Sequence, residues 1–224
     1  KPLASVKADE MPLSIDTFRF MAGAARCQLG SAAGEYVPGF TSMIRRDPVG
    51  VVGSIAPWNY PLMMAAWKMA PALAAGCPLV LKPSQITPLT TLRLAELAAG
   101  IFPKGVVNVI VGRGSTTGNA LINNPKLEMV SLTGGPGTAS KILEAASRNI
   151  MHTHMELGGK APVIVFEDVD LESVIETIRG GSYFNAGQDC AQPCRLYVAD
   201  QIYDRLVADL VVAVGSIKLG GEEL

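Results

Sequence analysis

The chain has 224 residues, of which 19 are basic and 20 acidic, and its formal net charge is -1. Nucleic acids and anionic membranes attract proteins through an excess of basic side chains, so this balance gives no electrostatic case for either partner. Hydrophobic residues make up 49% of the sequence and are spread along its whole length, which is typical of a soluble globular protein.

Residues 34–46 are the first segment with a clear pattern. Polar and apolar residues alternate around the Pro38-Gly39 turn, as in a β-hairpin. Such an arm, at about residues 30–47, can pair with another subunit or can pack on its own domain, and both interpretations stay open.

From Val49 onward, short β-branched runs alternate with helical stretches at the spacing of βαβ units. The most apolar stretch, residues 60–81, is interrupted by Lys68 and three prolines, so it is predicted as a buried helix and strand and not as a membrane span. Strands that are apolar on both faces belong in a parallel sheet covered by helices on each side, which predicts a doubly wound, Rossmann-like α/β domain. The expected strands are residues 51–55, 79–81, 106–111 and 129–132, and the expected helices are residues 62–75, 89–99, 118–123 and 139–148.

A second αβ unit follows Gly158-Gly159. We expect a strand at residues 162–166, a helix from its cap at Asp170 to about Tyr183, a strand at 195–198 and a helix at 202–214. Because this unit is too short for a complete domain, we divide the chain near Leu157, into residues 1–157 and 158–224. The chain begins at Lys1 without a signal-like segment, and we expect it to be a piece of a longer protein.

The four cysteines lack the spacing of a disulfide framework. They therefore indicate free thiols and a reducing compartment, with the cytoplasm as the expected location. Cys27, Cys77 and Cys194 are expected to be small buried apolar residues. Because Cys190 and Cys194, even with His152 and His154, lack metal-ligand spacing, no metal is expected.

Two strings carry most of the chemical information. Cys190 ends Phe184-Asn185-Ala186-Gly187-Gln188-Asp189-Cys190, and Glu156 lies in Met155-Glu156-Leu157-Gly158-Gly159-Lys160. A thiol that can ionise and a carboxylate on a separate glycine-flanked segment are a nucleophile and a general base. Gly187 permits an unusual backbone turn, which favours a presented side chain over a buried thiol.

Three further segments follow predicted strands at their carboxyl ends, where open α/β sheets bind ligands. Asn59, after Ala56-Pro57-Trp58, can donate to an oxyanion or cap a helix. Lys82, in Lys82-Pro83-Ser84-Gln85, can bind ribose hydroxyls or end a strand in solvent. Thr133-Gly134-Gly135-Pro136-Gly137-Thr138 can hold a pyrophosphate through backbone N–H groups, although it lacks the usual dinucleotide fingerprint.

Together, in this order and over essentially the whole chain, these strings resemble the NAD(P)-dependent aldehyde dehydrogenase superfamily. The resemblance implies a catalytic set of Cys190, Glu156, Asn59 and Lys82, in which Cys190 attacks an aldehyde carbonyl while Asn59 and the Cys190 N–H hold the oxyanion. Hydride then passes to the nicotinamide, and Glu156 activates water to hydrolyse the thioester. It makes residues 1–157 an incomplete nucleotide-binding domain and residues 158–224 the first part of a catalytic domain. Because the family's later segment has no counterpart, the 224-residue piece alone is expected to be inactive.

The resemblance also implies cofactor contacts, position by position. NAD is the expected cofactor; Gln85 stands where NAD-preferring members commonly have Glu, so discrimination against NADP should be relaxed. Gly135 stands where Ser is usual and Ala139 where Gly is usual. The implied contacts are Ile55, Ala56, Pro57 and Trp58 at the first strand end, Lys82, Pro83, Ser84 and Gln85 at the ribose, Gly114 and Gly118 beside the adenine, Gly134, Gly135, Pro136, Gly137 and Thr138 at the pyrophosphate, and Leu157 near the nicotinamide.

Within the superfamily, the strings look most like the aminoaldehyde branch, with 4-aminobutanal as an example of the substrate. The Asp189 carboxylate can attract an ammonium-bearing aldehyde, or it can point away as a turn residue. The resemblance further implies a homodimer or homotetramer at full length. Two other classes stay open: a cofactor-independent thiol hydrolase, similar to nitrilases that also use Glu, Lys and Cys, and a non-catalytic dinucleotide-binding structural protein.

Overall fold

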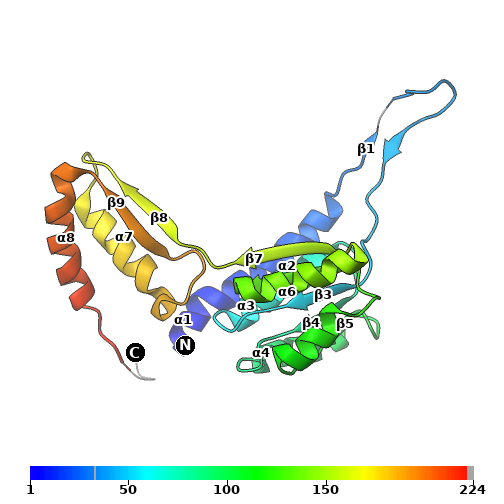
Figure 1. The fold of residues 1–224 in the computed structure, drawn as a ribbon, viewed down its shortest axis with the longest axis horizontal. Coiled ribbons are helices and arrows are strands. Elements are labelled where there is room, and N and C mark those ends of the chain that lie inside the picture. The colour runs from blue at the N-terminus through cyan, green and yellow to red at the C-terminus, as the bar shows by residue number, and fades with distance from the viewer. Residues whose placement is uncertain (33, 221–224) are drawn as a thin grey trace. The chain divides into compact units, whose positions relative to one another are not determined.

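The computed structural model describes residues 1–32 and 34–220, which form two compact units (Figure 1). The first unit is Ser5–Glu156, and the second runs from Leu157 onward and includes Lys1–Ala4. Residues 33 and 221–224, which fall in the predicted arm and in the predicted second domain, lie outside the described residues.

A five-stranded sheet of order β5-β4-β3-β6-β7 forms the centre of the first unit. β3 pairs in parallel with both β4 and β6, and β4 pairs in parallel with β5. The chain therefore winds outward from β3 in both directions, which confirms the predicted doubly wound α/β fold. The strands are β3 (Val52–Ile55), β4 (Leu79–Lys82), β5 (Val107–Val109), β6 (Met129–Gly134) and β7 (His152–Leu157).

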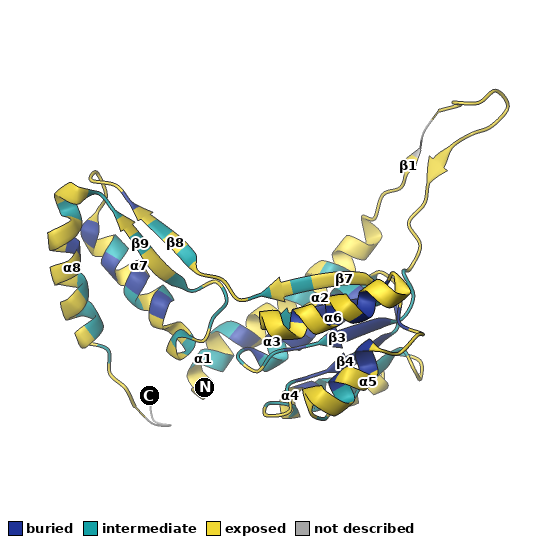
Figure 2. Ribbon diagram, viewed as in Figure 1, coloured by how far each residue is buried: buried dark blue, intermediate teal, exposed yellow. Residues whose placement is uncertain are grey.

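Helices cover both faces of this sheet, so that β3 and β4 are its most buried strands (Figure 2). On one face, apolar side chains of α3 and α4 pack on Val52, Leu79 and Leu81, and Phe18 of α2 joins the same core. On the other face, α6 packs against β6, and α5 against α6. The helices are α2 (Met11–Arg26), α3 (Pro61–Ala74), α4 (Leu89–Ala99), α5 (Asn119–Ile122) and α6 (Pro136–Asn149).

Strand alternation decides which residues reach each face. Val52 and Ser54 of β3 line a cleft beside α3, whereas a Cβ added at Gly53 would point the other way and lie 2.8 Å from Leu127 Cδ1. In the same way, Ser131 and Thr133 of β6 and His154 and Glu156 of β7 face the cleft.

The predicted hairpin is present and extends away from the sheet of its own unit (Figure 1). β1 (Ser31–Ala32) pairs antiparallel with β2 (Met43–Ile44), and an isolated bridge joins Val37 and Phe40 across the turn.

The second unit packs two helices on a short parallel sheet of β8 (Ala161–Val165) and β9 (Pro193–Val198). Its core includes Val165, Leu171 and Leu206, from β8, α7 (Leu171–Tyr183) and α8 (Asp200–Gly215). Asp170 precedes α7 as predicted, and a hydrogen bond from the Ser173 hydroxyl lowers the pKa of its carboxyl.

Two sequence expectations about cysteines are wrong. Cys77 is buried, but Cys27 and Cys194 are exposed. Cys27 follows the last residue of α2, where the chain leaves the core, and Cys194 lies on the largely exposed strand β9.

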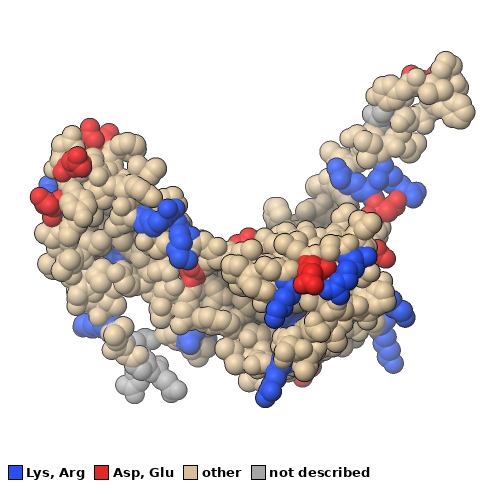
Figure 3. Space-filling view, viewed as in Figure 1, with Lys and Arg blue, Asp and Glu red and all other residues tan. Residues whose placement is uncertain are grey.

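The surface shown in Figure 3 carries basic and acidic side chains in small separate groups, in keeping with the balanced composition. Within residues 1–32 and 34–220, no helix has both the length and the hydropathy needed to cross a membrane.

Candidate active site

The carboxyl ends of β3, β4 and β6 meet at one edge of the sheet. Ile55 at the end of β3 is in register with Lys82 of β4 on one side and with Leu132 of β6 on the other. Since β4 and β6 lie on opposite sides of β3, this edge is the switch point at which open α/β sheets bind ligands. The three segments singled out in the sequence therefore begin at neighbouring strand ends.

The segment after β3 leads from the sheet into α3. Ala56 is buried, and its N–H donates to the Lys82 carbonyl at 3.1 Å, so the chain stays fastened to β4 beyond the strand. Trp58 is exposed and Asn59 is half-buried. Pro61 then opens α3, where a missing N–H costs the helix nothing.

Lys82 is a buried cation at the end of β4. Its Nζ donates to the Pro83 carbonyl at 3.1 Å, and burial lowers its pKa. A Cβ added at Gly118 would lie 3.6 Å from Lys82 Cε, so these two positions, remote in sequence, are neighbours. Ser84 is half-buried, and Gln85 and Gly114 are exposed.

The amino terminus of α6 offers backbone donors. Gly134 ends β6, Gly135 precedes the helix without a side-chain cap, and the first turn holds no acidic residue. A Cβ added at Gly135 or Gly137 would meet nothing within 4 Å, so the approach to the N–H groups is open. Together with the buried ammonium of Lys82, this donor set fits a phosphate-bearing ligand such as a dinucleotide.

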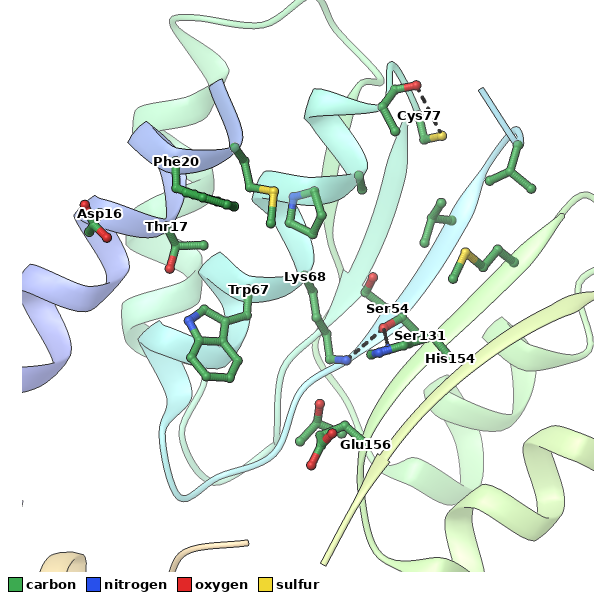
Figure 4. Close-up of a pocket in the computed structure, with 18 residues that line it drawn as sticks. Asp16, Thr17, Phe20, Ser54, Trp67, Lys68, Cys77, Ser131, His154 and Glu156 are labelled. Carbon is green, nitrogen blue, oxygen red and sulfur yellow. Dashed lines mark hydrogen bonds between the residues drawn. The ribbon is translucent and has the colours of Figure 1, made fainter. Parts of the chain in front are cut away.

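A cleft of about 700 Å³ lies on the α3 side of the sheet (Figure 4). Inside it, Lys68 Nζ donates to Ser131 Oγ at 2.9 Å, and Ser131 Oγ lies 3.1 Å from His154 Nδ1. Burial lowers the pKa of Lys68 from 10.5 to about 8, and attraction to Glu156 partly opposes that shift. Residues of α2, α3, β3, β6 and β7 line the cleft, among them Asp16, Ser54, Trp67, Thr133 and Glu156, together with Cys77 between α3 and β4.

Sequence reasoning missed this hydrogen-bonded group. In the sequence, Lys68 is an interruption of an apolar run, and His154 lacks the spacing of a metal ligand. The sequence did carry a sign of buried polar groups, because Lys68 is the only charged residue in α3 and Ser131 lies between two apolar residues of β6.

Cys190 lies in the second unit, in a tight segment after α7. Asn185, Ala186 and Gly187 have φ of 50°, 56° and 72°. Asn tolerates left-handed backbone but Ala does not, so surrounding contacts must hold Ala186 in it. Asn185 Nδ2 donates to the Gln188 carbonyl at 3.2 Å, and Gln192 Nε2 donates to the Ser182 carbonyl.

The two residues at the end of this segment have defined surroundings. Cys190 is half-buried, and a Cβ added at Gly159 would come within 2.9 Å of the Cys190 carbonyl oxygen, so Gly159 permits close approach. Asp189 Oδ1 accepts the Ala191 N–H at 2.9 Å, which is the turn contact that the sequence left as one alternative. Leu157 opens this second unit, whereas Glu156, Asn59 and Lys82 belong to the first.

The aldehyde dehydrogenase family matches residues 1–223. A betaine aldehyde dehydrogenase from Bacillus subtilis (strain 168) is 46% identical over 222 residues, which are 98% of this chain and 45% of that protein.

Solved structures agree. A betaine aldehyde dehydrogenase from Staphylococcus aureus in complex with NAD+ is 43% identical, with a TM-score of 0.96 over 99% of this chain and 44% of that one. An aldehyde dehydrogenase from Bacillus cereus in an NAD+ complex is 38% identical, with a TM-score of 0.94, 99% of this chain and 45% of that one being covered. The chain thus spans about half the length of these relatives. Sequence and fold agree, and the chain belongs to the aldehyde dehydrogenase family.

Proposed function

We propose that the full-length protein oxidises an aldehyde to the carboxylic acid, with Cys190 as the nucleophile and NAD as the cofactor. The observation that carries the proposal is the Cys190 segment, in which three residues with positive φ precede a half-buried thiol. Family membership and the NAD+ complexes of similar proteins support the same chemistry.

In this proposal, each protein group has one task. Cys190 attacks the carbonyl carbon as a thiolate, and the Asn59 amide and the Cys190 N–H stabilise the oxyanion. When bound, NAD accepts the hydride from the carbon attached to sulfur. Glu156 then takes a proton from water, whose oxygen attacks the resulting thioester and displaces the Cys190 thiolate.

The cofactor would bind at the carboxyl edge of the sheet. We assign Ile55 to Trp58 to cofactor contacts at the end of β3, Lys82 to Gln85 and the glycines Gly114 and Gly118 to the adenosine half, and the amino terminus of α6 to the pyrophosphate. Buried Lys82 and the open α6 terminus support this assignment. Leu157 near the nicotinamide, tolerance of NADP through Gln85, a homodimer or homotetramer, and a cytoplasmic location remain predictions.

Cys194 provides a matched control for the nucleophile, because it is an exposed cysteine four residues away. In the full-length protein, Cys190→Ala should abolish aldehyde-dependent NADH formation, and Cys194→Ala should leave it close to wild type. Acid or ammonia released from a nitrile or amide without cofactor would instead indicate the thiol hydrolase. Iodoacetamide labelling of Cys190 no faster than that of Cys27 would favour a non-catalytic protein.

We further propose an aminoaldehyde, such as 4-aminobutanal, as the substrate. The Asp189 carboxylate precedes the nucleophile directly, and betaine aldehyde, named for several relatives, is likewise cationic. Oδ1 of Asp189 accepts the Ala191 N–H, so the carboxylate is held in its turn. From this position its negative charge would attract the ammonium group of the substrate at short range.

Asp189→Asn keeps an acceptor oxygen for the turn and removes the charge. The ratio of kcat/KM for 4-aminobutanal to that for pentanal should fall by about tenfold, which corresponds to about 1.4 kcal/mol. An unchanged ratio would assign Asp189 to the turn alone.

A further inference from the structure

Two loops leave the sheet side by side at its carboxyl edge, one after β4 and one after β5 (Figure 1). Leu81 of β4 is in register with Val109 at the end of β5, and the Ile110 N–H donates to the Leu81 carbonyl at 3.0 Å. The first loop contains Gln85, and the second contains Arg113. Two residues far apart in the sequence are therefore carried by neighbouring loops.

The loop after β5 turns back toward Lys82 at the end of β4. The Gly118 N–H donates to the Arg113 carbonyl at 3.1 Å. A Cβ added at Gly118 would lie 4.0 Å from that carbonyl oxygen and 3.6 Å from Lys82 Cε. The Arg113 backbone is therefore separated from Lys82 by little more than the Gly118 backbone, a gap that the long side chain of an arginine can cross.

The charge in these two loops is entirely positive. Lys82 and Arg113 are the only charged residues in segments 82–88 and 110–119. Arg113 is exposed, and among the residues that the structure describes no carboxylate forms an ion pair with it. By contrast, Arg93 of α4 pairs with Glu96 at 2.8 Å. Arg113 is thus a cation whose charge is left for a ligand to neutralise.

Side chains at this edge of an open α/β sheet distinguish NAD from NADP. A carboxylate that accepts from the ribose 2′-hydroxyl favours NAD, whereas a nearby arginine accommodates the 2′-phosphate of NADP. Gln85 is exposed and uncharged, so the first loop offers no carboxylate to repel a phosphate. The guanidinium of Arg113 is planar and always charged, and it can bind phosphate oxygens through two parallel N–H donors.

We propose that Arg113 binds the 2′-phosphate of NADP, so that the full-length protein uses NADP as well as NAD. This inference rests on the proposed function, in which Lys82 to Gln85 bind the adenosine half of the dinucleotide. The Gln85 amide would donate to the same phosphate. Arg113 thereby has a role in the choice of cofactor and none in the oxidation of the aldehyde.

Arg93 supplies a matched control. It is an exposed arginine on α4, the helix that follows the Gln85 loop, and its guanidinium is already paired with Glu96. Arg93→Gln removes the same charge from the same unit as Arg113→Gln does. It therefore measures the effect of net charge alone, without loss of the proposed phosphate contact.

The test is titration calorimetry of the full-length protein with adenosine 5′-monophosphate and adenosine 2′,5′-bisphosphate, which differ only in the 2′-phosphate. Arg113→Gln should weaken binding of the bisphosphate by about tenfold, which corresponds to about 1.4 kcal/mol, and leave the monophosphate unchanged. Gln85→Glu should weaken the bisphosphate alone, through repulsion. Arg93→Gln should match wild type, and Arg113→Lys, which keeps a positive charge, should retain part of the affinity. The ratio of kcat/KM for NADP to that for NAD should fall with the bisphosphate affinity.

Equal weakening of both probes in Arg113→Gln, or no weakening of either, would overturn the assignment of Arg113. So would a wild-type protein that oxidises aldehyde with NAD and binds the monophosphate but not the bisphosphate. A wild-type protein that binds neither probe and forms no NADH with any aldehyde would refute the proposed function itself, and this result is distinct from the others.

Discussion

At the scale of single residues, Lys68 shows how an apolar helix tolerates a charge. Its ammonium lies in the cleft on the α3 side of the sheet, where it donates to Ser131. Attraction to Glu156 raises the pKa of Lys68, but burial has the larger effect and lowers it to about 8. The protonated form is therefore disfavoured in the folded protein relative to the unfolded chain. A residue in this state is held against a free-energy penalty, in keeping with a functional role.

Lys68→Met should stabilise the full-length protein at pH 7, by about 1–3 kcal/mol. Below pH 8 both folded and unfolded states carry the proton, so the penalty is complete there. Between about pH 8 and 10.5 the unfolded chain binds more protons, so wild-type stability rises with pH and the advantage of the variant shrinks. Urea unfolding of wild type and Lys68→Met at pH 7 and pH 10 measures the difference in their free energies of unfolding. Exposed Lys141 is the control, and a difference that does not change with pH would contradict the expected linkage.

Candidate site residues could be predicted from the sequence only where they lie in short recognisable motifs. Cys190, Glu156, Asn59 and Lys82 lie in strings whose order resembles a family, whereas Lys68, Ser131 and His154 lie 63 and 23 positions apart along the chain. Their contact depends on strand order and on which face each strand presents. Register therefore joins residues that no local pattern connects.

At the scale of elements, two segments position Cys190, the proposed nucleophile, within the second unit. The turn at residues 185–187 holds three positive φ values, and Gly159 lies against the carbonyl of Cys190. Gly187 in the sequence permitted such a turn, and Asn185 is of a type that tolerates left-handed backbone, but the left-handed Ala186 was not predictable, because alanine avoids that backbone region.

Gly159→Ala should displace Cys190, because the new Cβ would lie 2.9 Å from a backbone oxygen. Labelling of Cys190 by iodoacetamide in the full-length protein should change, and acyl-enzyme formation should fall by at least about tenfold. Gly158→Ala is the paired control, since its Cβ would meet nothing within 4 Å. Equal labelling and equal rates of acyl-enzyme formation in the two variants would contradict a role of Gly159 in positioning Cys190.

Most strands and helices from β3 onward matched their predicted ranges. In that part of the chain the apolar residues recur with a clear helix or strand period, and Gly and Pro mark the ends of the elements. The helix α2 received no prediction. Its Ser14 and Thr17 hydroxyls bond to the carbonyls of Glu10 and Leu13, and such residues are weak helix formers whose pattern does not indicate a helix. Packing against α3 therefore stabilises α2 as a helix where its local sequence does not indicate one.

At the scale of the whole molecule, the chain combines a unit built on a five-stranded sheet with a smaller unit that contains Cys190, the proposed nucleophile. It spans about half the length of its relatives, so the proposed turnover is a prediction for the full-length protein. The 224-residue piece alone is expected to give no steady-state oxidation of aldehyde, and robust turnover by that piece would contradict this expectation.

The most direct test of the account is the site of acylation. Full-length protein carrying Glu156→Gln, a change expected to slow hydrolysis, should be mixed with NAD and 4-aminobutanal, quenched and digested for mass spectrometry. The account predicts a 4-aminobutanoyl mass on the peptide that contains Cys190, dependent on NAD and lost in Cys190→Ala. An acyl group on Cys27, Cys77 or Cys194 instead, or no acyl group on any cysteine, would contradict it.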